Sequence, residues 1–279
     1  MKKIALMTDS SADISESLAQ ELGIYVVRLP LIIDNVQYLE EIDISTEEFM
    51  QKMRNGAITK TSSPLFGTMI ALWEELLETY DEVIYVPISS GLSGTYNTAY
   101  AASLNYNGKV VVIDAKFVCY PLTRLCIDIK KMIEKGYSAV GIKDIVETQA
   151  EMWACLMPEN LNALMRGGRT TPAVATLANL LKIVPLLKVE NGAIDVQEKV
   201  RTHKKAYDRA AILCTSMENK EDYEFMVVDA GLPLEAQKLA NHLSELTNQP
   251  VNIYPMHPII MSHCGPGTLA CGYYKKLKY

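Results

Sequence analysis

The sequence predicts an α/β protein built around a parallel sheet. One observation supports this fold class, and a second bears on the number of domains. The first half alternates short β-branched segments with segments whose apolar residues recur every three to four positions, which is typical of a parallel sheet wrapped by helices. The chain has 279 residues, 49% of them hydrophobic, which is enough for one long domain or two of ordinary size. We place a boundary near residue 155, which gives domains 1–155 and 156–279.

Strands and helices are expected to alternate in the first half. The expected strands are residues 3–7, 24–33, 82–88 and 109–114. One helix is expected at 15–22, ending at Gly23 as a C-terminal cap, and another after the capping-box pattern STEE at 45–48, ending near residue 56. Further helices are expected at 65–80, with Pro64 in its first turn, and at 95–104, 120–136 and 142–152.

The second half has a different order. A helix, a glycine break and a second helix are expected within residues 163–181. A hairpin is expected at 183–201, turning at Asn191–Gly192. The remaining elements are a helix at 202–214, a strand at 223–231, a helix at 233–246, a strand at 251–260 and a closing loop at 262–274.

Composition excludes several classes of protein. The net charge of −6 and the lack of a dense Lys/Arg block argue against nucleic-acid binding. The apolar run after Lys2 and Lys3 is too short for a signal peptide, and no segment approaches the ~18 apolar residues of a membrane span. We therefore expect a cytoplasmic protein without stable membrane insertion. The six cysteines show neither a C-x-x-C pair nor metal-ligand spacing, so we expect reduced structural cysteines and no metal.

Three polar loops follow expected strands, at residues 8–11, 89–95 and 263–268. Ligands of open α/β sheets lie beyond the carboxyl ends of the strands, so we expect these loops to gather there. Thr61–Ser63 precedes an expected helix, whose free N–H groups attract anions. The sequence therefore indicates a pocket for a small anion such as a carboxylate or a phosphate.

Each of these features also has a structural interpretation. Ser and Thr before a helix usually cap it, Gly91 and Gly94 suit turns, and a lone histidine or helix-end arginine is often structural. Ser93 with His263 and Asp9 could form a hydrolase triad, but GLSGT lacks the G-x-S-x-G nucleophile elbow. The P-loop and G-x-G-x-x-G motifs are also absent. The residues alone thus indicate an anion site without clear catalytic machinery.

A series of motifs spans nearly the whole chain, and SSGLSGTY at Ser89–Tyr96 is the most specific of them. The others are TDSSADI at Thr8–Ile14, KTSSP at Lys60–Pro64, VVVIDA at Val110–Ala115, LNALMRGGR at Leu161–Arg169, LLKIVPLL at Leu180–Leu187 and HCGPGTLACGYY at His263–Tyr274. In order and spacing these motifs resemble the DegV family of bacterial fatty-acid-binding proteins. The resemblance implies two α/β domains with mainly parallel sheets and a ligand between the domains.

The same resemblance implies a lipid-binding protein and not an enzyme. Family members carry the acyl substrate of a bacterial fatty acid kinase system, in which a separate kinase subunit carries the ATP and phosphorylates the bound fatty acid to acyl-phosphate. The implied partners are therefore a long-chain fatty acid such as palmitate and a fatty acid kinase subunit. No cofactor is implied.

The resemblance also carries over site residues by position. The implied ligands of the fatty-acid carboxylate are two hydroxyls, two amides at a helix start and one imidazole, from Thr61, Ser93, Gly94, Thr95 and His263. Weaker implied contacts to the headgroup or to the kinase come from Ser62, Arg169 and Arg201. The chain departs from the family pattern at Ser63, where Gln is more common, and at Ala115, where Ser or Thr is more common.

Two other functions stay open. Ser93 could act as the nucleophile of a serine hydrolase or acyltransferase, which a fluorophosphonate probe would label. A lipid-responsive regulatory protein would instead bind a partner other than a kinase. The acyl tunnel is expected to draw on the apolar residues of AVATLANLLKIVPLL at 173–187, although residues at helical spacing are more often plain core.

Overall fold

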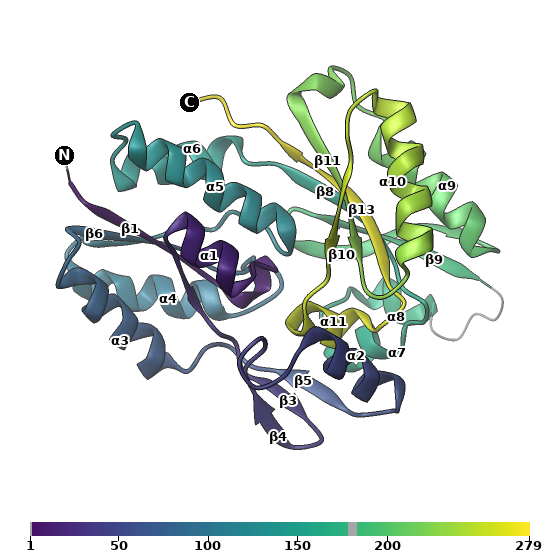
Figure 1. Cartoon of the computed structure of the whole chain (residues 1–279), viewed down its shortest axis with the longest axis horizontal. Coiled ribbons are helices and arrows are strands. Elements are labelled where there is room, and N and C mark those ends of the chain that lie inside the picture. The colour runs from purple at the N-terminus through teal and green to yellow at the C-terminus, as the bar shows by residue number, and fades with distance from the viewer. Residues whose placement is uncertain (1, 178–182) are drawn as a thin grey trace. The chain divides into compact units, whose positions relative to one another are not determined.

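The chain crosses repeatedly between two structural units in the computed structural model, which describes residues 2–177 and 183–279 (Figure 1). Unit 1 comprises residues up to Ser45, Thr61–Ala150 and Leu277–Tyr279. Unit 2 comprises Thr46–Lys60 and the described part of Glu151–Lys276. The sequence-based boundary near residue 155 falls inside a strand of unit 2, because no change of composition marks the crossing at residues 150–151.

The sheet of unit 1 has four parallel strands in the order β2-β1-β6-β7. These strands are β1 (Ile4–Asp9), β2 (Ile24–Val27), β6 (Glu82–Val86) and β7 (Val110–Val112). Every residue of β1 is buried, as expected for a central parallel strand covered on both faces. The parallel sheet predicted for the first half is confirmed.

Helices cover both faces of this sheet. They are α1 (Glu16–Leu22), α3 (Phe66–Leu77), α4 (Thr95–Ser103), α5 (Tyr120–Glu134) and α6 (Ala139–Gln149), with short 3-10 turns η1 (Ser10–Ala12) and η2 (Leu104–Tyr106). Figure 1 shows α3 and α4 on one face and α5 and α6 on the other. Trp73 of α3 is fully buried and packs edge-on against Tyr85 of β6, with ring centroids 6.1 Å apart.

The single strand expected at 24–33 is wrong, because the chain forms two strands there. β2 ends at Val27, and β3 (Leu31–Ile33) begins after Pro30, which has no N–H to donate to a sheet ladder. β3 pairs antiparallel with β4 (Val36–Tyr38), which the sequence did not predict. Asp34 and Asn35 turn this hairpin with φ of 47° and 67°, a conformation that Asn and Asp adopt more readily than most residues.

The sheet of unit 2 has six strands in the order β10-β9-β8-β13-β11-β12. They are β8 (Met152–Met157), β9 (Val184–Glu190), β10 (Ala193–Val200), β11 (Tyr223–Asp229), β12 (Asn252–Pro255) and β13 (Leu269–Lys275). Only β11 and β12 pair in parallel among these described strands. A mainly parallel sheet is therefore wrong for unit 2, because hairpin and return connections replace the helical crossovers that parallel neighbours need.

The sequence patterns of unit 2 were partly misleading. The hairpin at β9–β10 is confirmed, with Asn191 and Gly192 at φ of 50° and 77°. β8 was missed, because MWACLM has neither β-branched residues nor alternation, and α6 ends at Gln149 rather than at residue 152. The strand expected at 251–260 ends at Pro255, and Pro258 instead opens α11 (Pro258–Cys264). The loop expected at 262–274 contains the central strand β13. The sequence did not predict this strand, because its residues Ala270 and Gly272 are small and not typical of strands.

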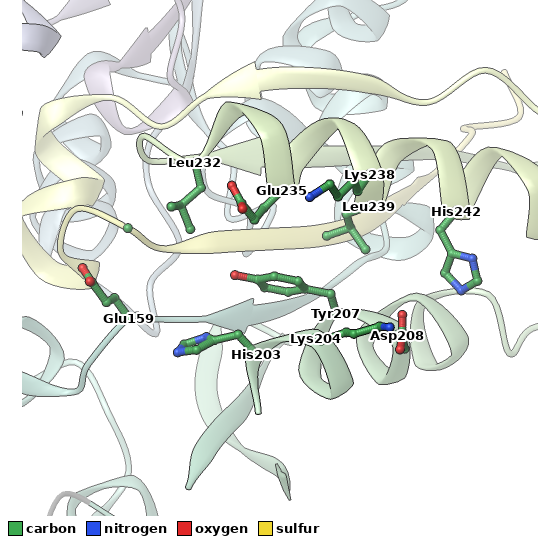
Figure 2. A pocket seen from close by; sticks show the side chains of 11 residues that line it. Glu159, His203, Lys204, Tyr207, Asp208, Leu232, Glu235, Lys238, Leu239 and His242 are labelled. Atoms are coloured by element: carbon green, nitrogen blue, oxygen red, sulfur yellow. The ribbon is translucent and has the colours of Figure 1, made fainter. Parts of the chain in front are cut away.

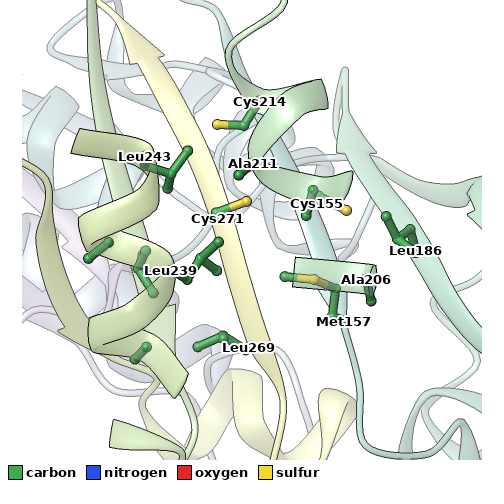
Figure 3. Close-up of a cluster of buried hydrophobic side chains, with 14 of the residues drawn as sticks. Cys155, Met157, Leu186, Ala206, Ala211, Cys214, Leu239, Leu243, Leu269 and Cys271 are labelled. Atoms are coloured by element: carbon green, nitrogen blue, oxygen red, sulfur yellow. The ribbon is translucent and has the colours of Figure 1, made fainter. Parts of the chain in front are cut away.

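The remaining elements of unit 2 are mostly helical. They are α2 (Thr46–Arg54), α7 (Asn162–Gly167), α8 (Pro172–Leu177), α9 (His203–Cys214), α10 (Pro233–Thr247) and the turn η3 (Lys220–Asp222), while β5 (Thr59–Thr61) leads the chain back to unit 1. Side chains of α9 and α10 line a pocket (Figure 2), and their inner faces bury the sheet in an apolar core (Figure 3).

The helices in the described part of the chain are all too short or too polar to cross a lipid bilayer.

The cysteines pack as small apolar side chains. All six lie within the described residues, none forms a disulfide, and all except the half-buried Cys119 are buried. Figure 3 shows Cys155, Cys214 and Cys271 within the core of unit 2. Burial raises the pKa of the Cys126 thiol to about 12 and also raises the pKa of Cys155, so neither forms the reactive thiolate at neutral pH.

Iodoacetamide should therefore alkylate Cys119 first in the native protein. We expect the buried cysteines to react at least about tenfold more slowly until the protein is denatured, because burial excludes the reagent and, at Cys126 and Cys155, also disfavours the thiolate. Peptide mass spectrometry after timed labelling measures each site. Native labelling of Cys126 at the denatured rate would contradict the packing described here.

Candidate functional site

Two polar loops meet at the carboxyl edge of the parallel sheet in unit 1. β1 and β6 are neighbours, so the residues that follow them lie side by side. The hydroxyl of Thr8 donates to the carbonyl of Val86 at 2.8 Å and ties the two strand ends together. We call Ser89–Thr95, the segment after β6, the hydroxyl loop. The expectation that loops 8–11 and 89–95 gather at this edge is confirmed.

Asp9 joins these two loops. Its carboxylate is fully buried and accepts the N–H of Ser11 at 3.0 Å, the hydroxyl of Ser11, and the N–H of Ile88 at 2.9 Å. Burial raises the pKa of Asp9, while the hydrogen bonds from Ser11 and Ile88 oppose that rise. Both carboxylate oxygens are thus used to build the loops of unit 1, and this arrangement does not support Asp9 as the acid of a hydrolase triad.

The hydroxyl loop ends in two adjacent hydroxyls at the start of α4. Ser93 Oγ lies 2.9 Å from Thr95 Oγ1, and the N–H of Thr95 donates to Ser93 Oγ at 3.3 Å. Gly94 occupies the N-cap position with φ of −73° and makes no side-chain cap hydrogen bond. Glycine is therefore not required there by backbone conformation. Hydroxyls and helix-start amides in this arrangement can donate hydrogen bonds to a small anion.

Thr61–Ser63 lies at and after the end of β5 and does not cap the following helix. Thr61 ends β5 and is half-buried. Ser62 is exposed; its N–H donates to the carbonyl of Pro30 at 3.1 Å, and its hydroxyl donates to the carbonyl of Ser63 at 3.1 Å. α3 begins only at Phe66, with no side-chain cap, so Pro64 lies before the helix and not in its first turn. The usual capping role thus does not explain these hydroxyls.

In unit 2 the structure brings together two motifs that are far apart in the sequence. His263 lies in the last turn of α11, which packs against α7. A Cβ on Gly167 would lie 2.6 Å from Nδ1 of His263, so only glycine lets the imidazole approach the α7 backbone without a shift. Arg169 is exposed and donates to the carbonyl of Gly167 at 2.6 Å. The loop containing His263 was expected to follow a strand; that was wrong, because it joins α11 to β13.

His263 is a neutral imidazole in this setting. Burial, together with the positive charge of Arg169, lowers the pKa of His263 to about 4. At neutral pH the ring therefore carries no charge.

Arg201 and a separate pocket lie elsewhere in unit 2. Arg201 is exposed between β10 and α9, and the neighbouring Thr202 caps α9 by accepting the N–H of Lys205 at 3.2 Å. A pocket of about 690 Å³ lies between α9 and α10, and Tyr207 and Glu235 are among its lining side chains (Figure 2). None of the site residues expected from the sequence lines it. Across residues 2–177 and 183–279, no three His, Cys, Asp or Glu side chains gather as metal ligands.

The expected acyl tunnel is only partly within the described residues, because 178–182 of segment 173–187 lie outside them. Of the described residues in that segment, Val184 and Leu186 belong to the core that α9 and α10 cover. The tunnel residues stay a prediction.

Sequence reasoning missed the two carboxylates that hold the hydroxyl loop. Asp9 was considered only as a triad acid, and Asp114 had no assigned role. Asp114 Oδ2 accepts the hydroxyl of Ser90 at 2.5 Å, and its Oδ1 accepts the N–H of Ser90 at 3.2 Å. The Asp-x-Ser spacing of Asp9 and Ser11, typical of an Asx-turn, was a signal for the first of them.

Together these features define a two-domain α/β protein with a hydroxyl-rich loop at the carboxyl edge of a parallel sheet. A family model described as "Uncharacterised protein, DegV family" matches residues 3–276, and the chain belongs to that family.

Relatives of known sequence or structure match the chain over nearly its whole length. A DegV domain-containing protein of Halalkalibacterium halodurans is 32% identical over 280 residues, which cover 98% of this chain and 99% of that protein. A fatty acid binding DegV family protein from Streptococcus agalactiae has a similar structure, with a TM-score of 0.89, 27% identity, and coverage of 99% of this chain and 100% of that one. DegV, a fatty acid binding protein from Bacillus subtilis, gives a TM-score of 0.85 at 30% identity, covering 99% and 100%.

His263 should make stability depend on pH. Its pKa is lowered on folding, so between about pH 6.5 and about pH 4 the unfolded chain binds more protons at this residue than the folded chain. The free energy of unfolding should therefore fall as pH drops through that window. His263→Gln should lose less stability than the parent protein between about pH 7 and about pH 4.5 in urea denaturation.

His203→Gln, at an exposed position on α9, is the matched control and should follow the parent protein. Equal pH dependence in His263→Gln and the parent would contradict the assignment of a neutral, half-buried imidazole.

Proposed function

We propose that this chain binds a long-chain fatty acid and presents its carboxylate to a separate fatty acid kinase subunit, which phosphorylates it to acyl-phosphate. The observation that carries the proposal is the pair of adjacent hydroxyls of Ser93 and Thr95 at the start of α4, where the N-cap residue Gly94 makes no side-chain cap hydrogen bond. Membership of the DegV family supports it, as do the similar structures from Streptococcus agalactiae and Bacillus subtilis that bind fatty acids.

The headgroup chemistry follows from the hydroxyl loop. Ser93 and Thr95 bond to each other in this structure, and a hydroxyl hydrogen can rotate to a better acceptor. A carboxylate is such an acceptor, because hydrogen bonds to an ionised oxygen are about twice as strong as those between neutral groups. The amide of Gly94 adds a donor at the helix start, the amide of Thr95 can add another by leaving Ser93 Oγ, and Thr61 supplies a further hydroxyl. His263 is a further proposed ligand of the carboxylate, and Ser62 is a weaker proposed contact.

The acyl tail supplies most of the proposed affinity. Burying a methylene gains about 0.8 kcal/mol, so a C16 tail such as that of palmitate offers on the order of 10 kcal/mol before the entropic losses of binding. The hydroxyls then set direction, since a carboxylate buried without donors would cost several kcal/mol. Tail burial therefore provides retention, while the loop selects which end of the lipid lies at the headgroup site.

Thr61→Ala with Ser93→Ala should weaken palmitate binding while the fold stays intact. Each lost hydrogen bond to a charged group is worth about 1.5 kcal/mol, so the double variant should raise Kd about 100-fold. Isothermal titration with delipidated protein measures the change, and circular dichroism checks the fold.

The matched control is Thr68→Ala with Ser103→Ala. It removes the same two hydroxyl types from α3 and from the far end of α4. A Kd that rises equally in both double variants, or in neither, would remove the assignment of Thr61 and Ser93 as carboxylate ligands.

Two measurements separate a carrier from an enzyme. Protein purified without added lipid should show a fatty-acid mass increment in native mass spectrometry that denaturation releases. Incubation with palmitate and ATP should yield acyl-phosphate, trapped as the hydroxamate, only when a bacterial fatty acid kinase subunit is added. An increment that survives denaturation, or labelling of Ser93 by a fluorophosphonate probe, would favour the serine hydrolase instead.

Arg169 and Arg201 are the proposed docking residues for the kinase subunit. Both are exposed cations of unit 2, and exposed arginines readily pair with carboxylates of a partner.

A further inference from the structure

Three successive backbone amides, of Ile88 just before the hydroxyl loop and of its first two residues, donate hydrogen bonds to groups outside the loop. Ile88 donates to Asp9 Oδ2 at 2.9 Å, and Ser89 donates to the carbonyl of Phe117 at 3.0 Å. Ser90 donates to Asp114 Oδ1 at 3.2 Å. The loop therefore begins from a fixed backbone position.

Beyond these amides the loop closes on itself. The N–H groups of Leu92 and Ser93 both donate to the carbonyl of Ser89, at 3.0 Å and 3.1 Å. The N–H of Gly91 donates to the hydroxyl of Ser89 at 3.2 Å. Ser93 is thus placed through Ser89, so its position depends on whatever holds residues 88–90.

The two carboxylates that hold this segment come from both sides of β6. Asp9 ends β1, and Asp114 follows β7, the strands that flank β6 in the sheet. Asp9 is fully buried, whereas Asp114 is half-buried and is itself held by its N–H, which donates to Glu147 of α6 at 3.1 Å. Each carboxylate is therefore fixed by other elements of unit 1 as well as bonded to the loop.

We propose that Asp9 and Asp114 are positioning residues that set the Ser93 and Thr95 hydroxyls for a fatty-acid carboxylate. The inference rests on the proposed function, and it assigns to these residues a role that acts through the loop and not through contact with the ligand. Direct contact is unfavourable, because two carboxylates repel each other.

An amide in place of either carboxylate tests this role at nearly constant shape. Asparagine has one acceptor oxygen, and its NH₂ group cannot accept the N–H that the second carboxylate oxygen accepted. In Asp9→Asn the amides of Ile88 and Ser11 compete for one oxygen in a fully buried place. In Asp114→Asn the N–H of Ser90 keeps an acceptor oxygen, but the hydroxyl of Ser90 loses its charged acceptor and can only accept from the new NH₂ group, which is a weaker hydrogen bond. Water can reach this half-buried site, so that variant should fold.

Palmitate titration and amide hydrogen exchange of residues 88–95 together test whether Asp9 and Asp114 position the hydroxyl loop for binding. Asp114→Asn and Asp9→Asn should each raise Kd about tenfold and speed exchange in the loop. Ser11→Ala is the control in the same buried cluster: it removes one donor to Asp9 and keeps the Ile88 hydrogen bond. Its Kd should stay within about twofold of the parent value even where its urea midpoint falls.

Two results would overturn the inference. The first is faster amide exchange in the loop of Asp114→Asn with an unchanged Kd for palmitate. The second is a Kd that rises in proportion to the loss of urea stability in all three variants, Ser11→Ala included. Asp114→Asn decides alone if Asp9→Asn does not fold. A parent protein that binds no palmitate would instead refute the proposed function, while unchanged loop exchange in Asp114→Asn would still refute the anchoring.

Discussion

A buried carboxylate at the end of the first strand is the constraint on which the candidate site depends. Removing Asp9 from water is costly, and hydrogen bonds from Ser11 and Ile88 to both of its oxygens offset that cost. Those donors lie on two separate segments, so satisfying one charge fixes the ends of β1 and β6 against each other. In the parallel register Thr8 faces Val86, so the Asp9 carboxylate lies beside the residues that follow β6, where the hydroxyl loop begins.

In unit 2, close packing and not a buried carboxylate fixes the position of the candidate site residue His263. His263 approaches the α7 backbone so closely that a side chain on Gly167 would collide with its ring. Partial burial and the nearby cationic Arg169 lower the pKa of this imidazole, so it stays neutral. In each unit a residue distant in sequence decides the geometry of a motif: Asp9 for the hydroxyl loop, and Gly167 for His263.

Sequence patterns predicted the parallel sheet of unit 1 well and unit 2 less well, for a physical reason. Continuous apolar strands that alternate with helices usually form a parallel sheet buried on both faces, and the strands at 4–9 and 82–86 do so. β8 and β13 lack β-branched residues and are strands because of their neighbours, which no local pattern reports. The hydroxyls of the site could be predicted from the polar composition of the loop. The roles of Asp9 and Asp114 could not, because they act through hydrogen bonds between segments separated in sequence by tens of residues.

The neutrality of the hydroxyl loop bears on the proposed role as a carrier. Residues 89–95 contain no charged side chain, so the donors offered to a carboxylate are hydroxyls and amides. A lysine or arginine there would hold the carboxylate as an ion pair and draw electron density from the oxygen that, in the proposed role, attacks a phosphoryl group. Neutral donors orient the same oxygen and leave it more nucleophilic. Placing the carboxylates of Asp9 and Asp114 behind the loop, where backbone amides and the Ser90 hydroxyl occupy them, gives the rigidity of charged anchors without presenting their charge to the ligand.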